Sequence, residues 1–210
     1  MPDARSSRFA GYLLALLAAL CWATGGLTAK WLFTTPSSAT ASWPLPPLGI
    51  TVEPTALSGA RALSAFAILC AYLLVRDRSK LVLAGWRDVP FLAVFGVAGL
   101  AAVHFTYFKT ISLTNVATAI LLQYLAPVIV LIVGVLFMGH RFTWALPAGV
   151  ALSVTGCALV VGALGGTGLV VTPQGIAWGL AAAVFFASYS LMGSHAAQRF
   201  SPLTLLVYGL

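Results

Sequence analysis

Long apolar runs separated by short polar breaks follow one another along almost the whole chain. A helix needs about 20 apolar residues to cross the roughly 30 Å hydrocarbon core of a bilayer. Runs of this length predict six membrane spans, at residues 10–32, 54–75, 89–108, 115–138, 143–163 and 174–195. Ser201-Pro202 begins a further helix, and the sequence ends at Leu210, before that helix could cross. We therefore expect an all-α polytopic membrane protein whose last span is incomplete.

The composition argues against a soluble protein and against several functions. Hydrophobic residues make up 60% of the chain and charged residues 7%, whereas about 25% of a soluble domain is charged. The formal net charge is +7, but Lys and Arg are scattered between the apolar runs and form no basic stripe for nucleic acid. Cys21, Cys70 and Cys157 lie singly inside apolar runs, so we expect neither a disulfide framework nor a metal site. The lipid bilayer is the expected partner.

The distribution of Lys and Arg predicts the orientation, because cytoplasmic loops carry the excess of these residues. An N-terminus inside the cell places most of them on the cytoplasmic side: Arg5, Arg8, Arg76, Arg78, Lys80, Arg87, Arg141 and Arg199. The segment 164–172 has no charge. We expect residues 1–9 to be a cytoplasmic tail and residues 164–172 to be an outer loop.

A weak internal repeat relates the first and sixth spans. Setting Gly11 against Gly175 aligns similar residues: Ala18 with Ala182, Trp22 with Phe186, Ala23 with Ala187 and Thr24 with Ser188. Two helices rich in small residues also align by chance. If the repeat is real, five spans precede the second copy, so that copy inserts upside down. Inverted repeats are typical of secondary transporters, which bind their solute near the midplane between the halves.

The fourth span carries polar groups that could hold a solute. Asn115, Thr118, Gln123 and Pro127 share one helical face. Pro127 has no N–H and crowds the carbonyl of Gln123, so we expect a bent helix with a free carbonyl beside an amide side chain. Tyr124 lies next to them and is a further candidate. The alternative is a proline kink whose free backbone groups bond to neighbouring helices, with the Gln123 side chain hydrogen-bonding between helices.

Arg61 is a second candidate, because it lies about 12 Å along the second span. A charge at mid-membrane costs at least about 2.5–3.5 kcal/mol, which makes an intramembrane Arg a functional hypothesis. Together with Lys30 and Lys109, Arg61 would attract a carboxylate or phosphate group. The alternative is three cations that extend back to the interface. His104 and Tyr107 of the third span are candidates for the same path, and interfacial packing is the alternative for both.

Enzymatic activity is not indicated. Ser194 and His195 are adjacent, but neighbouring residues on a helix point in different directions and cannot share a proton. No acidic residue lies within a central span. The sequence predicts no catalytic residue and no cofactor.

Two stretches resemble a known family. Phe105–Val130, followed by Gly149–Gly156, resembles the third to fifth helices of EamA-type proteins in the drug/metabolite transporter superfamily. Arg61 and the region of Trp22 resemble the second and first helices, and Trp22 thereby joins the candidate path. Gly139-His140 departs from the Gly-Glu that such proteins usually carry there, which removes a carboxylate.

The resemblance implies a ten-helix carrier built from two inverted five-helix repeats. Residues 10–163 would form the first repeat, and residues 173–210 would begin the second. It also implies secondary transport of small metabolites, such as amino acids, nucleosides or drugs, by alternating access across the cell membrane. A non-transporting membrane scaffold or an inactive fragment is the alternative. The sequence leaves open the solute, the coupling ion and whether the chain forms a homodimer.

Overall fold

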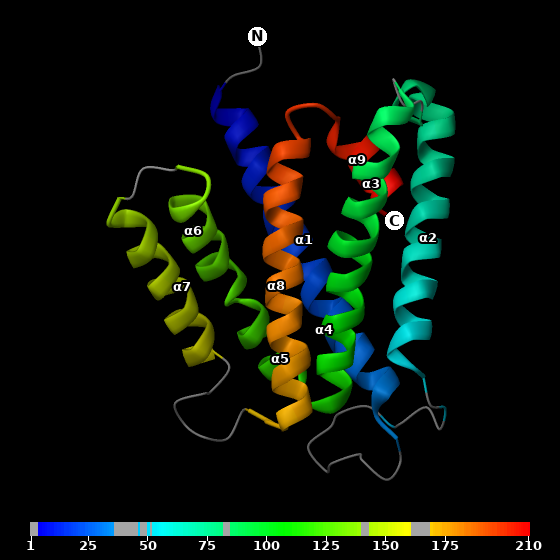
Figure 1. Ribbon diagram of the computed structural model, residues 1–210. Coiled ribbons are helices and arrows are strands. Elements are labelled where there is room, and N and C mark those ends of the chain that lie inside the picture. The colour runs from blue at the N-terminus through cyan, green and yellow to red at the C-terminus, as the bar shows by residue number, and fades with distance from the viewer. Residues whose placement is uncertain are drawn as a thin grey trace. The chain divides into compact units, whose positions relative to one another are not determined.

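The computed structural model describes residues 4–35, 46, 50, 52–81, 85–139, 143–160 and 169–210. Within these ranges every regular element is a helix (Figure 1). The chain divides into two compact units, Met1–Val52 and Glu53–Leu210, which are described separately. The predicted all-α fold is confirmed.

The described part of the first unit is dominated by α1, Ala4–Phe33, which contains the predicted span 10–32. Its threonines return their hydroxyls to the helix backbone: Thr24 donates to the carbonyl of Leu20 at 3.0 Å, and Thr28 donates to that of Thr24 at 2.8 Å. Such local bonds satisfy hydroxyl groups that hydrocarbon cannot solvate.

The second unit holds the remaining helices, which are α2 Pro54–Arg76, η1 Arg78–Leu81, η2 Trp86–Asp88, α3 Val89–Val94, η3 Phe95–Ala101, α4 Ala102–Leu113, α5 Val116–Gln123, α6 Ala126–Leu136, α7 Ala145–Val160, α8 Pro173–Ala196 and α9 Pro202–Gly209. The predicted third span consists of α3, the π-helical segment η3 and α4, and the predicted fourth span consists of α5 and α6. The predicted spans thus correspond to helices whose ends differ by a few residues.

Polar caps and prolines set the starts of three helices. Asn115 accepts a hydrogen bond from the backbone N–H of Thr118, and Thr172 and Ser201 cap α8 and α9 in the same way. α8 and α9 also carry Pro in the first turn. N–H groups of the first turn have no acceptor within the helix, so a proline there costs no hydrogen bond. These caps satisfy backbone N–H groups that the first turns of the three helices would otherwise leave unpaired.

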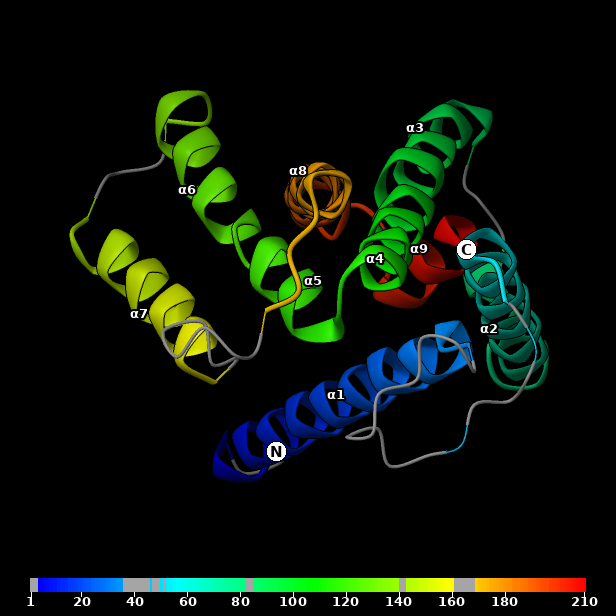
Figure 2. The same cartoon turned by 90° about the horizontal axis from the view of Figure 1, so that it is seen from below.

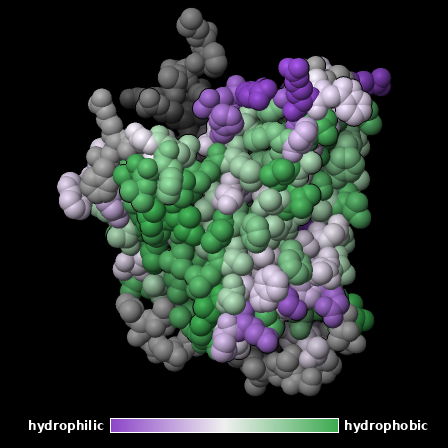
Figure 3. Space-filling view, viewed as in Figure 1, coloured by the Kyte–Doolittle hydropathy of each residue, from purple (hydrophilic) through white to green (hydrophobic). Residues whose placement is uncertain are grey.

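Five described helical segments are long and apolar enough to cross a membrane: Gly11–Phe33, Pro54–Arg76, Trp86–Leu113, Val116–Leu136 and Pro173–Ala196. The predicted span 143–163 is described as a shorter apolar helix, Ala145–Leu159, and its last residues lie outside the described ranges. On the face shown in Figure 3, hydrophobic residues cover the middle of the helices of the second unit, and hydrophilic residues gather toward their ends. This distribution fits a bilayer around the helices.

α8 is the central helix of the second unit, because it packs against α4, η3, α5 and α6. Figure 2 shows it end-on between α4 and the α5–α6 pair. Small buried residues recur on α8 at intervals of four, namely Gly175, Gly179, Ala183 and Ala187. A Cβ on Gly179 would lie 2.9 Å from the Cβ of Leu122 on α5. The α8 backbone therefore approaches its neighbours more closely than larger side chains would permit.

We predict that Gly179→Ala destabilises the protein by about 1–3 kcal/mol, because the added methyl overlaps Leu122. Gly149→Ala is the matched control, since a Cβ there meets nothing within 4 Å, and alanine is the better helix former. Thermal unfolding of the detergent-solubilised protein, followed by circular dichroism, should show a lowered Tm for the first variant alone. Equal Tm values for the two variants would contradict close packing at Gly179.

Candidate functional site

The predicted fourth span is interrupted two residues before Pro127. α5 ends at Gln123 and α6 begins at Ala126. Across the break the N–H of Leu125 donates to the carbonyl of Leu122 at 3.1 Å, and that of Val128 donates to the carbonyl of Leu125 at 3.0 Å. These bonds reach back three residues rather than four. Pro127 lacks the N–H that would donate to Gln123, so the interruption lies where the sequence placed it.

A cavity of about 390 Å³ opens between α6, α7 and α8, and Pro127 is part of its wall. The wall is mainly apolar, with Val130 from α6, Val150 from α7 and Phe186 from α8. Ser190 is its hydroxyl-bearing residue, and that hydroxyl donates to the carbonyl of Phe186 at 2.8 Å. The cavity therefore offers shape and apolar surface, with little free hydrogen-bonding capacity.

The other polar residues of the predicted face have separate positions. Thr118 donates its hydroxyl to the carbonyl of Val170 at 3.0 Å, so it fastens the start of α5 to the segment before α8. Gln123 is 4% exposed, and its Nε2 has no hydrogen-bond partner among the described residues. Tyr124, by contrast, is 47% exposed. The structure brings Pro127 to the cavity, while Gln123 is buried and does not contribute to its wall.

Arg61 and two of the candidates from the third span lie together. The Arg61 guanidinium of α2 is 5.6 Å from the centre of the Phe108 ring on α4, a cation–π contact. The rings of His104 and Tyr107 lie 6.4 and 5.8 Å from the Phe108 ring, measured between ring centres. Tyr107 is 3% exposed, and its hydroxyl has no partner in the described part of the chain. We call these four residues, Arg61, His104, Tyr107 and Phe108, the Arg61 patch.

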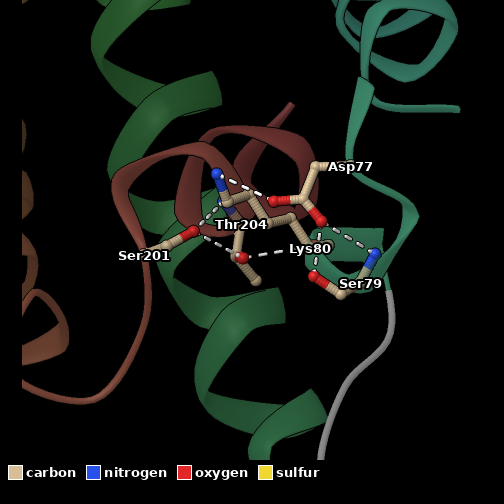
Figure 4. Close-up of polar contacts among 5 residues, drawn as sticks. All are labelled: Asp77, Ser79, Lys80, Ser201 and Thr204. Atoms are coloured by element: carbon tan, nitrogen blue, oxygen red, sulfur yellow. Dashed lines mark hydrogen bonds and ion pairs between the residues drawn. The ribbon is translucent and has the colours of Figure 1, made fainter. Parts of the chain in front are cut away.

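Hydrogen bonds join chain segments at the basic end of the unit, defined here as residues 76–81, 85–88 and 196–208. The hydroxyl of Thr204 donates to the carbonyl of Lys80 at 3.1 Å, and that of Tyr208 donates to the carbonyl of Leu81 at 2.7 Å. Arg199 pairs with Asp88 at 3.0 Å. Figure 4 shows Asp77, Ser79 and Lys80 beside Ser201 and Thr204. The segment after α2 is thereby tied to α9.

The opposite end, residues 113–116 and 170–173, is tied as well. Besides the bond from Thr118, the hydroxyl of Thr172 donates to the carbonyl of Leu113 at 3.3 Å. Gly175 packs directly against the methyl group of Thr114. α8 is therefore fastened to α4 and α5 at its first turn.

Two residues named in the sequence analysis, Trp22 and His140, are not among the described residues of the cavity or of the Arg61 patch. Trp22 lies on α1 in the first unit. His140, where the family pattern has Glu, lies outside the described residues. The sequence analysis did not identify Phe108, Thr204 or Tyr208, because a ring under a cation and hydroxyls that bind backbone carbonyls leave no spacing pattern.

The described helices define a multi-pass α-helical integral membrane protein, with an interrupted span beside a cavity. Comparison with known proteins gives the family. Residues 9–162 match the EamA-like transporter family, and the chain belongs to this family.

The chain's relatives include proteins described as transporters. The chain is 25% identical over 197 residues to the uncharacterized inner membrane transporter YicL of Salmonella typhimurium, an alignment that covers 93% of this chain and 61% of that protein. It is 31% identical over 124 residues to a probable terminal-alkyne amino-acid exporter of Streptantibioticus cattleyicolor, covering 59% of this chain and 41% of the exporter. The chain therefore spans less than two thirds of the length of either relative.

A protein of known crystal structure has a similar fold. It is 26% identical to this chain, with a TM-score of 0.56, and the match covers 88% of this chain and 62% of that one. The likeness supports the helical arrangement described above. The inverted repeat stays a prediction.

We predict a lowered pKa for Asp77, which follows α2 at the basic end. The hydrogen bond from the Ser79 hydroxyl and then the one from Lys80 hold the pKa of this carboxyl below its ordinary value of 3.8. The carboxylate thus stabilises the fold above pH 3.8, and this contribution disappears as the pH falls through the lower, folded-state pKa. Carboxyl NMR titration of the protein labelled at Asp should show a higher pKa in Ser79→Ala than in the wild type.

Ser64→Ala is the control for that titration, because the Ser64 hydroxyl donates to the carbonyl of Ala60 within α2 and does not approach Asp77. The expected pKa of Asp77 in this variant equals that of the wild type. An unchanged pKa in Ser79→Ala would show that the hydroxyl does not hold the carboxylate.

Proposed function

We propose that the protein is a secondary transporter of small metabolites, such as amino acids, nucleosides, drugs or related solutes, which works by alternating access in the cell membrane. Membership of the EamA-like transporter family supports the general class. The single observation that supports the mechanism is the interruption of a membrane span at Tyr124–Leu125 beside a cavity. Interrupted helices are where many carriers bind their solutes.

The size of the cavity suits a small metabolite. Ligand pockets in proteins measure about 300–1,000 Å³, and this cavity, at about 390 Å³, lies near the lower limit. Its apolar wall favours a solute with an apolar body. In this proposal Pro127, Tyr124 and Gln123 border the solute path, with Pro127 in the wall and the other two at the break.

One relative points to amino acids as the solute class. The relative from Streptantibioticus cattleyicolor is described as a probable terminal-alkyne amino-acid exporter. An amino acid with an apolar side chain combines the apolar body that fits the cavity with a carboxylate that a cation would attract. Amino-acid-like solutes are therefore the first class to test.

Alternating access requires the ties at the two ends to open in turn. At the basic end the Arg199 side chain is 62% exposed, and the pair of Lys80 and Asp77 is also partly exposed. Exposed ion pairs contribute only about 0–1 kcal/mol. At the opposite end the first turn of α8 is held by close packing of Gly175 as well as by hydrogen bonds. In our proposal the basic end, which lies in the cytoplasm if the N-terminus does, opens when the Arg199–Asp88 pair and the hydrogen bonds from Thr204 and Tyr208 break together.

The alternative is a membrane scaffold that carries no solute. The small-residue face of α8 fits either function, since such faces pack helices in membranes generally. Solute-driven counterflow distinguishes the two functions, because a scaffold shows none. The test can be carried out without knowing the coupling ion or whether the protein forms a homodimer.

We predict saturable counterflow of a neutral amino acid in liposomes that contain the protein expressed from its native reading frame. Val130→Trp should lower the exchange rate at least about tenfold, because the indole fills the cavity wall at Val130. Ile132→Trp is the matched control on the same helix, since Ile132 is 49% exposed and does not line the cavity. Its exchange rate should equal that of the wild type.

Three outcomes would oppose the proposal. Absence of counterflow for amino acids, nucleosides and drug-like cations alike favours the scaffold. Equal loss in both Trp variants would assign the effect to the fold rather than to the cavity. Unchanged exchange in Val130→Trp would remove the cavity from the solute path.

A further inference from the structure

The Arg61 patch joins groups that two different helices bring to one place. His104, Tyr107 and Phe108 are spaced by three and four residues on α4, so they share one face of that helix. Arg61 of α2 lies over this face, in contact with the ring of Phe108. α2 and α4 are packed neighbours. The patch is therefore a feature of the helix pair rather than of one segment.

The charge of Arg61 has no carboxylate beside it in the described part of the chain. Of the acidic residues described there, Asp77 pairs with Lys80 and Asp88 pairs with Arg199. Glu53 precedes α2 and lies eight positions from Arg61, a separation of about 12 Å along a helix. A π face stabilises a cation only weakly, so it does not replace a counter-ion in a membrane.

Hydrogen-bond donors in the patch also lack acceptors. The guanidinium offers several N–H donors in one plane, and its described contact is the ring of Phe108 rather than an acceptor. The hydroxyl of Tyr107 is buried and has no partner among the described residues. A buried hydroxyl without a partner destabilises the fold. An anion whose oxygens reached both groups would satisfy both.

His104 adds a restriction on the ligand. Its Nδ1 lies 2.8 Å from the carbonyl of Leu100. A carbonyl only accepts, so Nδ1 carries the hydrogen and the remaining ring nitrogen of a neutral imidazole is an acceptor. The patch thus holds one positive charge and one phenol donor. This inventory matches a monoanion better than a doubly charged phosphate.

We propose that the Arg61 patch is a binding subsite for the carboxylate of an organic acid. The guanidinium donates to both carboxylate oxygens in the fork geometry that Arg favours, and the Tyr107 hydroxyl donates to one of them. As part of a solute path the subsite rests on the proposed transport function. As a binding site it is tested by binding alone.

The test measures the thermal stability of the detergent-solubilised protein in the presence of acetate. Acetate is a small carboxylate, so it can bind the patch without contacts elsewhere in the protein. Acetamide is the uncharged isostere, and sodium chloride keeps the ionic strength constant. A ligand that binds the folded state raises Tm with its concentration. We expect Tm to rise with millimolar acetate and not with acetamide.

Substitutions locate the effect. Arg61→Gln should abolish the response to acetate, and Arg61→Lys should weaken it, because lysine keeps the charge but loses the fork. Tyr107→Phe should shift the half-effective acetate concentration upward about tenfold. Arg76→Gln and Tyr72→Phe are the matched controls, since both residues lie on α2 outside the patch. Both controls should respond as the wild type does.

Several results would overturn the subsite. They are a wild type that ignores acetate, an equal response to acetamide, a response that persists in Arg61→Gln, and a stronger response to inorganic phosphate than to acetate. Counterflow without acetate binding would overturn the subsite alone. Acetate binding through Arg61 in a protein without counterflow would overturn the transport function and leave the subsite in place.

Discussion

The close approach of α8 to α4 and α5 is the contact on which the rest of the second unit depends. In hydrocarbon, apolar side chains gain nothing by leaving the solvent, so helices associate through van der Waals contact and hydrogen bonds. Gly175 and Gly179 permit that contact, because a side chain on either would overlap Thr114 or Leu122. The hydrogen bonds from Thr118 and Thr172 then connect the same helices. α6, which continues beyond the break, contributes a wall of the cavity instead.

A second constraint is that polar side chains inside a membrane need hydrogen-bond partners, and side-chain length decides which of them find one in their own helix. Several short hydroxyl side chains donate to the backbone of their own helix. Thr106, Thr110 and Thr114 each donate to the carbonyl four residues earlier, at 2.6, 2.7 and 2.6 Å. Such residues need no ligand. Longer polar side chains extend beyond their own turn, and the buried side chains left without a partner in the described ranges are Tyr107 and Gln123. Length therefore separates self-satisfied residues from candidates for binding.

Much of the fold could be predicted from the sequence because the bilayer fixes a minimum length for apolar runs. The break before Pro127 could also be predicted, since proline removes a defined hydrogen bond. The π-helical segment η3 could not, because its ladder depends on packing: Gly96 lies against the backbone of Gly209, at the far end of the chain. Helical spacing also groups residues that take different positions in the structure. It grouped Thr118 with Pro127, but one fastens a helix end and the other lines the cavity.

The cavity and the Arg61 patch supply different halves of what solute recognition requires. A binding pocket needs both a concave apolar surface and a few polar groups that orient the ligand. The cavity has the surface, but the hydroxyl of Ser190 is already bonded. The patch has the charge and the free donors, and it shares no residue with the cavity wall. α8 packs against α4, which carries most of the patch, and against α6, which lines the cavity. The α5–α6 break is the weakest point of the helix beside the cavity, because Pro127 has no N–H to donate to Gln123 and the bonds from Leu125 and Val128 reach back three residues instead of four.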